Sequence, residues 1–106
     1  LKLFIYLSNT DENSGPHEFV KGSHNIGAKP TELLKMGYNR LSDKQINDYY
    51  NKNKIKKILG KKGTMFIGDT SCYHRGHPPI KNDRLLLVIE FSNSMFGASY
   101  KKINII

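Results

Sequence analysis

Hydrophobic and polar residues alternate at the start of the chain. Aliphatic side chains occupy the odd positions from Leu1 to Leu7, while Lys2, Phe4 and Tyr6 occupy the even ones. A period of two is typical of a β-strand, because successive side chains of a strand point to opposite faces. The pattern therefore predicts a strand here, with one aliphatic and one amphipathic face.

The same reasoning predicts further short strands. They cover residues 17–21, 54–59, 64–70 and 84–92, and clusters of turn-forming residues separate several of them. The densest cluster is SNTDENSGP at 8–16, where Asn, Asp and Ser side chains can bond to their own backbone. Short strands with little helix predict an all-β sandwich or jelly roll.

The segment 25–62 is more polar and contains two helix candidates. A short one follows Pro30 and Thr31. A better one begins after Ser42, which together with Gln45 fits a capping box. We interpret this segment as an insertion over a sheet.

Composition limits the range of partners. The chain has 17 Lys and Arg against 9 Asp and Glu, a formal charge of +8, which taken alone indicates a polyanion partner. Only three of the 17 are Arg, the residue that base-reading proteins use for bidentate contacts. The lysines at 54–57 and 101–102 are interpreted as solvated faces. We therefore expect no nucleic acid as partner.

Neither a membrane segment nor an oxidising compartment is indicated. The longest apolar run, Leu85–Ile89, is far shorter than the roughly 20 residues of a membrane helix. A single cysteine, Cys72, forms no internal disulfide, so a cytoplasmic location is expected. Because Leu1 and Ile106 lie inside apolar runs, we expect both ends to be cut from something longer.

The stretch from Gly63 to Glu90 carries the candidate chemistry. A strand is expected to run into His74, after which a loop turns the chain and Arg84 starts the next strand. Both faces of that strand are apolar, and a guanidinium there needs a carboxylate or phosphate to be tolerated. Taken alone, Arg84 could instead pair with Asp83, Glu90 or solvent, and His74 could be a hydrogen-bonded structural residue.

Four motifs occur in the order that they have in the phytanoyl-CoA hydroxylase-like family of non-haem Fe(II)/2-oxoglutarate-dependent dioxygenases. They are LSNTDENSGP at 7–16, KGSH at 21–24, GTMFIGD at 63–69 leading to HRG at 74–76, and Arg84. The chain thus resembles the C-terminal part of these enzymes over nearly its whole length. The resemblance implies an incomplete double-stranded β-helix, a jelly roll of the cupin type with a short helical insertion. Residues 1–106 would form its C-terminal portion, with the N-terminal portion absent.

The same resemblance assigns two site residues. His74 would be the distal histidine of the 2-His-1-carboxylate triad that binds Fe(II) and leaves open positions for other ligands. Arg84 would bind the far carboxylate of the cosubstrate 2-oxoglutarate through two hydrogen bonds. The implied reaction consumes dioxygen and 2-oxoglutarate and hydroxylates a small organic substrate whose identity the sequence does not indicate.

The chain departs from the family pattern at several positions. The other two metal ligands of the family come from a His-x-Asp motif, and none of the four histidines here is followed two places later by Asp. We therefore expect the chain alone neither to hold iron firmly nor to turn over. Lys21 replaces the usual Pro of the Pro-Gly-Ser-His turn, and Thr64 stands where the family has Asp. Gly76 stands where some members place a Ser or Thr that contacts 2-oxoglutarate, which leaves that contact in doubt.

The remaining histidines have weaker claims to the site. His77 is the main rival of His74 as metal ligand, but we expect it to lie in a loop. His24 is expected to have a structural role, and His17 is expected on the surface. Cys72 is interpreted as a buried thiol.

The residues leave two other functions open. One is a cupin-like barrel that uses a metal without redox chemistry, as an isomerase, or that only binds small molecules. The other, less favoured, is a basic nucleic-acid-binding module. For a small-molecule substrate, Tyr38 and Arg40 are the local candidates for contact.

Overall fold

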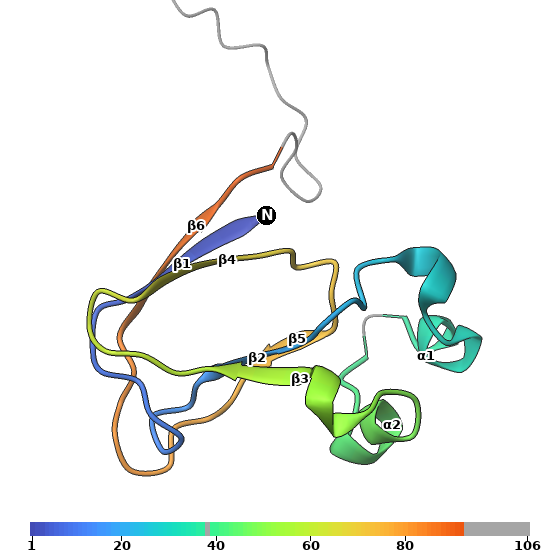
Figure 1. Cartoon of the computed structure of the whole chain (residues 1–106), viewed down its shortest axis with the longest axis horizontal. Coiled ribbons are helices and arrows are strands. Elements are labelled where there is room, and N and C mark those ends of the chain that lie inside the picture. Colours follow the sequence, from blue (N-terminus) through green and yellow to red (C-terminus); the bar gives the residue numbers. More distant parts are fainter. Residues whose placement is uncertain (38, 93–106) are drawn as a thin grey trace, which may run out of the picture.

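The computed structural model describes residues 1–37 and 39–92 of the 106, and within them the chain is mostly β (Figure 1). The strands are β1 (Lys2–Tyr6), β2 (His17–Val20), β3 (Ile55–Ile58), β4 (Met65–Gly68), β5 (His74–Gly76) and β6 (Leu86–Glu90). The all-β class predicted from the alternating patterns is confirmed.

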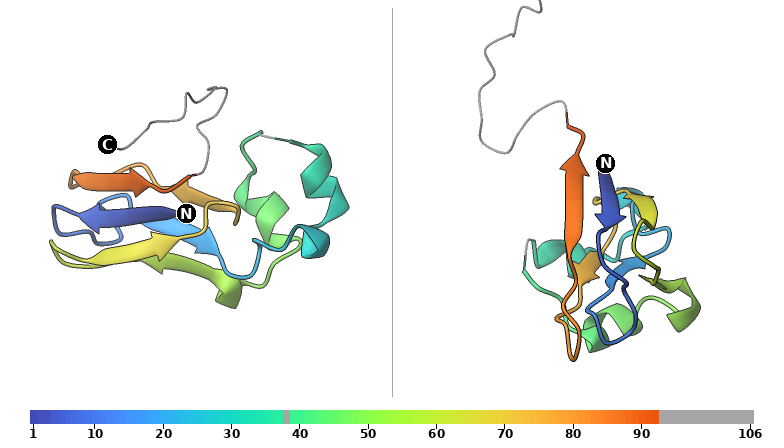
Figure 2. Two further views of the ribbon diagram at one scale, coloured as in Figure 1. Left: turned by 90° about the horizontal axis from the view of Figure 1, so that it is seen from above. Right: turned by 90° about the vertical axis from the view of Figure 1, so that its left-hand side faces the viewer.

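The strands form two antiparallel three-stranded sheets. One has the order β4-β1-β6 and the other the order β3-β2-β5. In Figure 1 the first sheet lies above the second, and Figure 2 shows the same arrangement from two further sides. Each sheet joins segments that are far apart in the sequence, since β1 pairs with β6 and β2 pairs with β5.

Short helices gather at one end of the sheets (Figure 1). They are α1 (Thr31–Lys35), α2 (Asp43–Asn47) and single 3-10 turns at Ile26–Ala28 and Lys52–Lys54. The predicted capping box is present, because the Ser42 side chain accepts from the Gln45 N–H and the Gln45 side chain accepts from the Ser42 N–H. None of the helices in the described ranges is long and apolar enough to cross a membrane.

Aromatic rings fill the space between the two sheets. The amphipathic face of β1 points inward and buries Phe4 and Tyr6. Phe4 stacks on Phe66 of β4 with ring centroids 4.8 Å apart, and Phe19 of β2 meets Phe4 edge-on at 6.1 Å. These contacts hold the sheets together, since aromatic pairs in these geometries add to the stabilisation that burial provides.

The aliphatic face of β1 points away from the other sheet. The register places aliphatic side chains of three strands on this outer face: Leu3 and Ile5 of β1, Met65 and Ile67 of β4, and Leu87 and Ile89 of β6. The four side chains from β4 and β6 are exposed. Exposed apolar faces of this kind are typical of surfaces that contact another segment or partner.

Tyr6 connects the two sheets through its hydroxyl group. The hydroxyl donates to the carbonyl oxygen of Ile58 at 2.7 Å and accepts from the backbone N–H of His17 at 3.3 Å. The residue has 0% of its surface exposed. This one buried oxygen therefore bonds to two backbone groups of the opposite sheet.

We expect Tyr6→Phe to lower the free energy of unfolding by about 1 to 3 kcal/mol, because it leaves buried backbone groups without a partner. Urea denaturation measures the change. The control is Tyr49→Phe, since Tyr49 is 46% exposed. If the two variants had the same stability, the Tyr6 hydroxyl would not connect the sheets.

Candidate functional site

β5 places His74 against β2. The two strands are antiparallel, with His17 opposite Gly76 and Phe19 opposite His74. Because side chains alternate along a strand, His74 and Gly76 share the inner face with His17 and Phe19. Arg75, between them, points to the outer face.

The strand that was expected to run into His74 is divided in two. β4 ends at Gly68, and β5 begins at His74 in the other sheet. The Asp69 side chain accepts hydrogen bonds from the Ser71 N–H at 2.9 Å and the Ser71 hydroxyl at 2.6 Å. This turn is the local reason for the break, since Asp and Ser side chains that bond nearby backbone compete with strand pairing.

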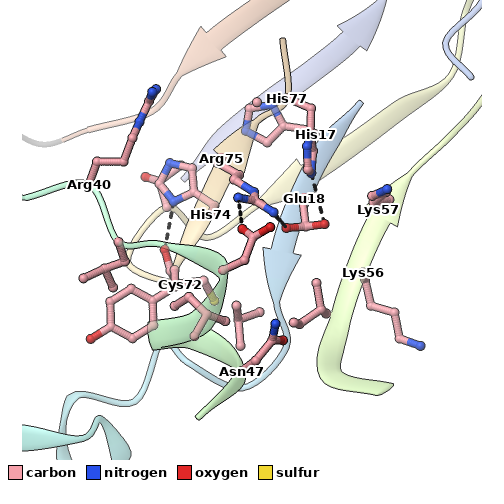
Figure 3. A pocket seen from close by; sticks show the side chains of 18 of the residues that line it. His17, Glu18, Arg40, Asn47, Lys56, Lys57, Cys72, His74, Arg75 and His77 are labelled. Atoms are coloured by element: carbon pink, nitrogen blue, oxygen red, sulfur yellow. Dashed lines mark hydrogen bonds and ion pairs between the residues drawn. The ribbon is translucent and has the colours of Figure 1, made fainter. Parts of the chain in front are cut away.

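The His74 imidazole is held in one orientation. Its centroid lies 5.6 Å from that of Phe19 and 6.0 Å from that of His17, in stacked geometry. Its Nδ1 atom lies 2.8 Å from the carbonyl oxygen of Cys72, as Figure 3 shows. A carbonyl only accepts, so Nδ1 carries the proton, and in the neutral ring Nε2 keeps a free lone pair. The ring is exposed, so this lone pair is open to a ligand from outside the chain.

The Arg84 guanidinium is half-buried and lies beside the Tyr6 hydroxyl. It donates to the carbonyl oxygen of Gly15 through Nη1. Burial raises the pKa of Tyr6, and the neighbouring Arg84 charge acts against that rise. Arg84 therefore points between the sheets, as expected if it shares the inward face of β6 with Leu86 and Val88, the register partners of Tyr6 and Phe4.

Arg84 has no carboxylate partner among residues 1–37 and 39–92. Of the two acids considered from the sequence, Glu90 pairs with Lys2 at 3.3 Å and Asp83 is exposed. The half-buried guanidinium is thus a permanent cation whose described partners, the Gly15 carbonyl and the Tyr6 hydroxyl, are both neutral. Such a group favours binding of an anion, because a carboxylate offers the charge that the carbonyl lacks.

Gly15 presents that carbonyl from a turn that only glycine fits. Its φ is +71°, and a side chain there would overlap the carbonyl oxygen of His77 and the nitrogen of Pro79. The loop after β1 and the loop after β5 are therefore in close contact beside Arg84. The Gly-Pro motif of the sequence has this packing role.

His17 was expected on the surface, and that prediction is wrong. Its ring lies between the sheets, with its centroid 4.6 Å from that of Phe4. Both ring nitrogens are buried and lack a hydrogen-bond partner in the described part of the chain. Burial, assisted by the Arg84 charge, lowers the pKa of His17 to about 4. The alternation of His17 and Phe19 on one face of β2 was the sequence signal that could have placed it.

The rival ligand His77 lies with the outer face of β2. Its Nε2 atom lies 3.1 Å from Glu18, whose other oxygen accepts from Arg75 at 2.9 Å. Arg75 also pairs with Asp43 at the start of α2, and Figure 3 marks these contacts. The network fixes α2 on the sheet and turns His77 away from the face that His74 occupies.

An open cleft of about 1420 Å³ lies between the helical segment and the β3-β2-β5 sheet. His74 and Arg40 both line it, and Figure 3 shows Arg40 coming from the helical segment and His74 from β5. Cys72 also lines it as a half-buried free thiol in the turn before β5. Tyr38, the other substrate candidate, lies outside the described residues.

The KGSH turn has a structural centre at Ser23, and His24 beside it is exposed. The buried Ser23 hydroxyl donates to the Val20 carbonyl at 2.7 Å and accepts from the Tyr73 N–H at 2.8 Å. The turn therefore holds the segment that leads into His74. The motif positions the site, and its histidine does not reach it.

Among residues 1–37 and 39–92, no group of three His, Cys, Asp or Glu side chains is placed to hold a metal ion. The described residues fit a metal at one point, the free Nε2 of His74, which is oriented as metal-binding histidines usually are. Comparison of the chain with protein-family models, curated proteins and solved structures finds no match. The family resemblance therefore depends on the sequence motifs alone.

The lowered pKa of His17 predicts that the free energy of unfolding decreases as the pH is lowered. The unfolded chain binds a proton at this residue near pH 6.5, whereas the folded chain does so only near pH 4. The contribution of His17 to the free energy of unfolding is fully present above pH 6.5. It is lost between pH 6.5 and 4, and the loss is about 3 kcal/mol at most. Urea unfolding at pH 7, 5.5 and 4 measures it, with His17→Phe as the reference. Parallel stability curves for the two proteins would contradict the buried position.

Proposed function

We propose that the chain supplies the distal histidine ligand and the 2-oxoglutarate-binding arginine of a non-haem Fe(II)/2-oxoglutarate-dependent dioxygenase. One observation carries the proposal. An arginine with no carboxylate partner among the described residues and an exposed histidine with a free, oriented Nε2 atom both adjoin His17. A diacid that chelates a metal at one end needs a cation at the other, and these two groups meet that need.

Arg84 would bind the carboxylate of the cosubstrate that is remote from the metal. Its guanidinium is permanently charged and planar, so it can form two parallel hydrogen bonds to a carboxylate. Removal from bulk water strengthens this attraction. A bound diacid would replace the neutral Gly15 carbonyl as the main partner of the Arg84 guanidinium. This ion pair would fix the orientation of the diacid.

His74 would bind Fe(II) through Nε2, while its Nδ1–H stays on the Cys72 carbonyl and keeps the ring from turning. Two further ligands would come from outside the described residues. When bound, Fe(II) supplies the activation of dioxygen that drives oxidative decarboxylation of 2-oxoglutarate and hydroxylation of the substrate. The protein's part at His74 would be to hold one coordination position at the open edge of the aromatic cluster.

The double-stranded β-helix remains part of the proposal. Two facing antiparallel sheets with functional groups directed between them support it. The substrate is proposed to be a small organic molecule that enters by the cleft beside His74. Arg40, which lines that cleft, is the described residue proposed to contact it.

We expect Arg84→Gln to weaken binding of 2-oxoglutarate to the 106-residue chain about a hundredfold, because the buried carboxylate loses its charged partner. Titration followed by NMR of the ¹⁵N-labelled chain measures the dissociation constant. Arg40→Gln is the matched control, since it removes an arginine of the cleft and leaves the interior unchanged. Equal affinity of Arg84→Gln and the unaltered chain would contradict the proposal.

We expect a paramagnetic divalent ion to reveal the ligand position. Substoichiometric Co²⁺ should broaden the side-chain ¹⁵N signals of His74 before those of the other histidines, because His74 has an exposed ring with an open Nε2. His74→Ala should remove the effect, and His77→Ala should not. Strongest broadening at His77 or His24 would show that the ligand assignment is wrong.

A further inference from the structure

His17 is a half-buried side chain with two buried ring nitrogens that the proposed reaction does not yet use. Its ring is enclosed by Phe4, Phe19 and Phe66, with centroid distances of 4.6, 5.3 and 6.3 Å. Neither nitrogen has a hydrogen-bond partner within the described ranges. An unsatisfied polar group in an aromatic core is costly, and a phenylalanine would fill the same space without that cost.

The Nδ1 atom of His17 and the guanidinium of Arg84 adjoin one point. That point is where a Cβ atom on Gly76 would lie, 3.7 Å from His17 Nδ1 and 3.1 Å from Arg84 Nη2. His17 and Gly76 are register partners on β2 and β5, so the strand pairing itself creates this proximity. Glycine leaves the point free of side-chain atoms.

The charges around His17 favour an anion at this point. The groups whose positive charge acts on its ring are Arg84, His74, Lys2 and His77. The nearest acid in the sequence, Glu18, points to the outer face and pairs with Arg75. A metal cation beside Nδ1 would be repelled by the guanidinium, whereas a carboxylate would be attracted by it.

We propose that His17 donates an Nδ1–H hydrogen bond to the same carboxylate that Arg84 binds, so that the two residues together form the site for the remote carboxylate of the diacid. This inference depends on the proposed function and adds a recognition residue to it. The carboxylate would lie above Gly76. The Arg84 guanidinium would donate to both of its oxygens, and the His17 imidazole N–H would donate to a remaining lone pair.

Glycine at position 76 has a role in this site. Any side chain there would begin at the point that the carboxylate is proposed to occupy, with its Cβ 3.1 Å from Arg84 Nη2. We therefore expect Gly76→Ala to weaken diacid binding, because its Cβ fills that point while both donors stay in place.

The test is a set of succinate and 2-oxoglutarate titrations of the 106-residue chain, followed by NMR. We expect His17→Phe, which keeps the aromatic packing, to weaken both diacids about tenfold through the loss of one hydrogen bond to a charged group. Gly76→Ala, which keeps both donors but fills the point above β5, should also weaken both diacids. Acetate, which has a single carboxylate, should bind much more weakly throughout.

The outcomes separate this inference from the proposed function. If Arg84→Gln abolishes binding but His17→Phe binds like the unaltered chain, the role of His17 is wrong and the role of Arg84 stands. If neither variant changes affinity, or if the unaltered chain binds neither diacid, both are wrong.

A measurement on the unaltered chain tests the same inference without depending on whether the variants fold. The ¹⁵N signal of His17 Nδ1 should shift on addition of succinate together with the Arg84 guanidinium signals. A shift of Arg84 alone would overturn the inference.

Discussion

The guanidinium of Arg84, placed between two sheets with no carboxylate partner in the described part of the chain, is the constraint on which the rest of the site depends. A half-buried arginine keeps its charge, so the fold must offer it oxygen atoms. Gly15 offers one carbonyl, from a turn whose positive φ excludes other residues. This one charge is surrounded by the Gly15 turn, the adjoining His77 loop and the inward face of β6.

The charge also explains why the neighbouring histidines differ. His17, enclosed by aromatic rings and close to Arg84, stays neutral to about pH 4. His74 lies at the open edge of the same aromatic cluster, with its Nδ1 proton fixed on the Cys72 carbonyl. One imidazole is thus suited to donate to an anion and the other to donate a lone pair to a metal. Two residues of the same type acquire different chemistry from burial and from one backbone hydrogen bond.

Local patterns predicted much of this structure, and long-range pairing decided the rest. The alternation in β1 and β6 and the capping box at Ser42 follow from neighbouring residues, so the sequence was sufficient for them. The inward position of His17 depends on β2 pairing with β5, which is more than fifty residues away. The alternation along β2 indicated that His17 shares a face with Phe19, and the pairing decided that this face points inward. The break before His74 was missed because Asp69 and Ser71 read equally well as the end of one strand. The roles of His74 and Arg84 came from resemblance, and the structure adds their surroundings.

The most direct measurement is a crystal structure of the chain grown with 2-oxoglutarate. We expect the diacid to lie between the sheets. Its remote carboxylate should contact Arg84 above Gly76, and its oxo-acid end should point toward Nε2 of His74. A diacid bound to the outer-face network around Arg75, or an Arg84 side chain turned out into solvent, would contradict it.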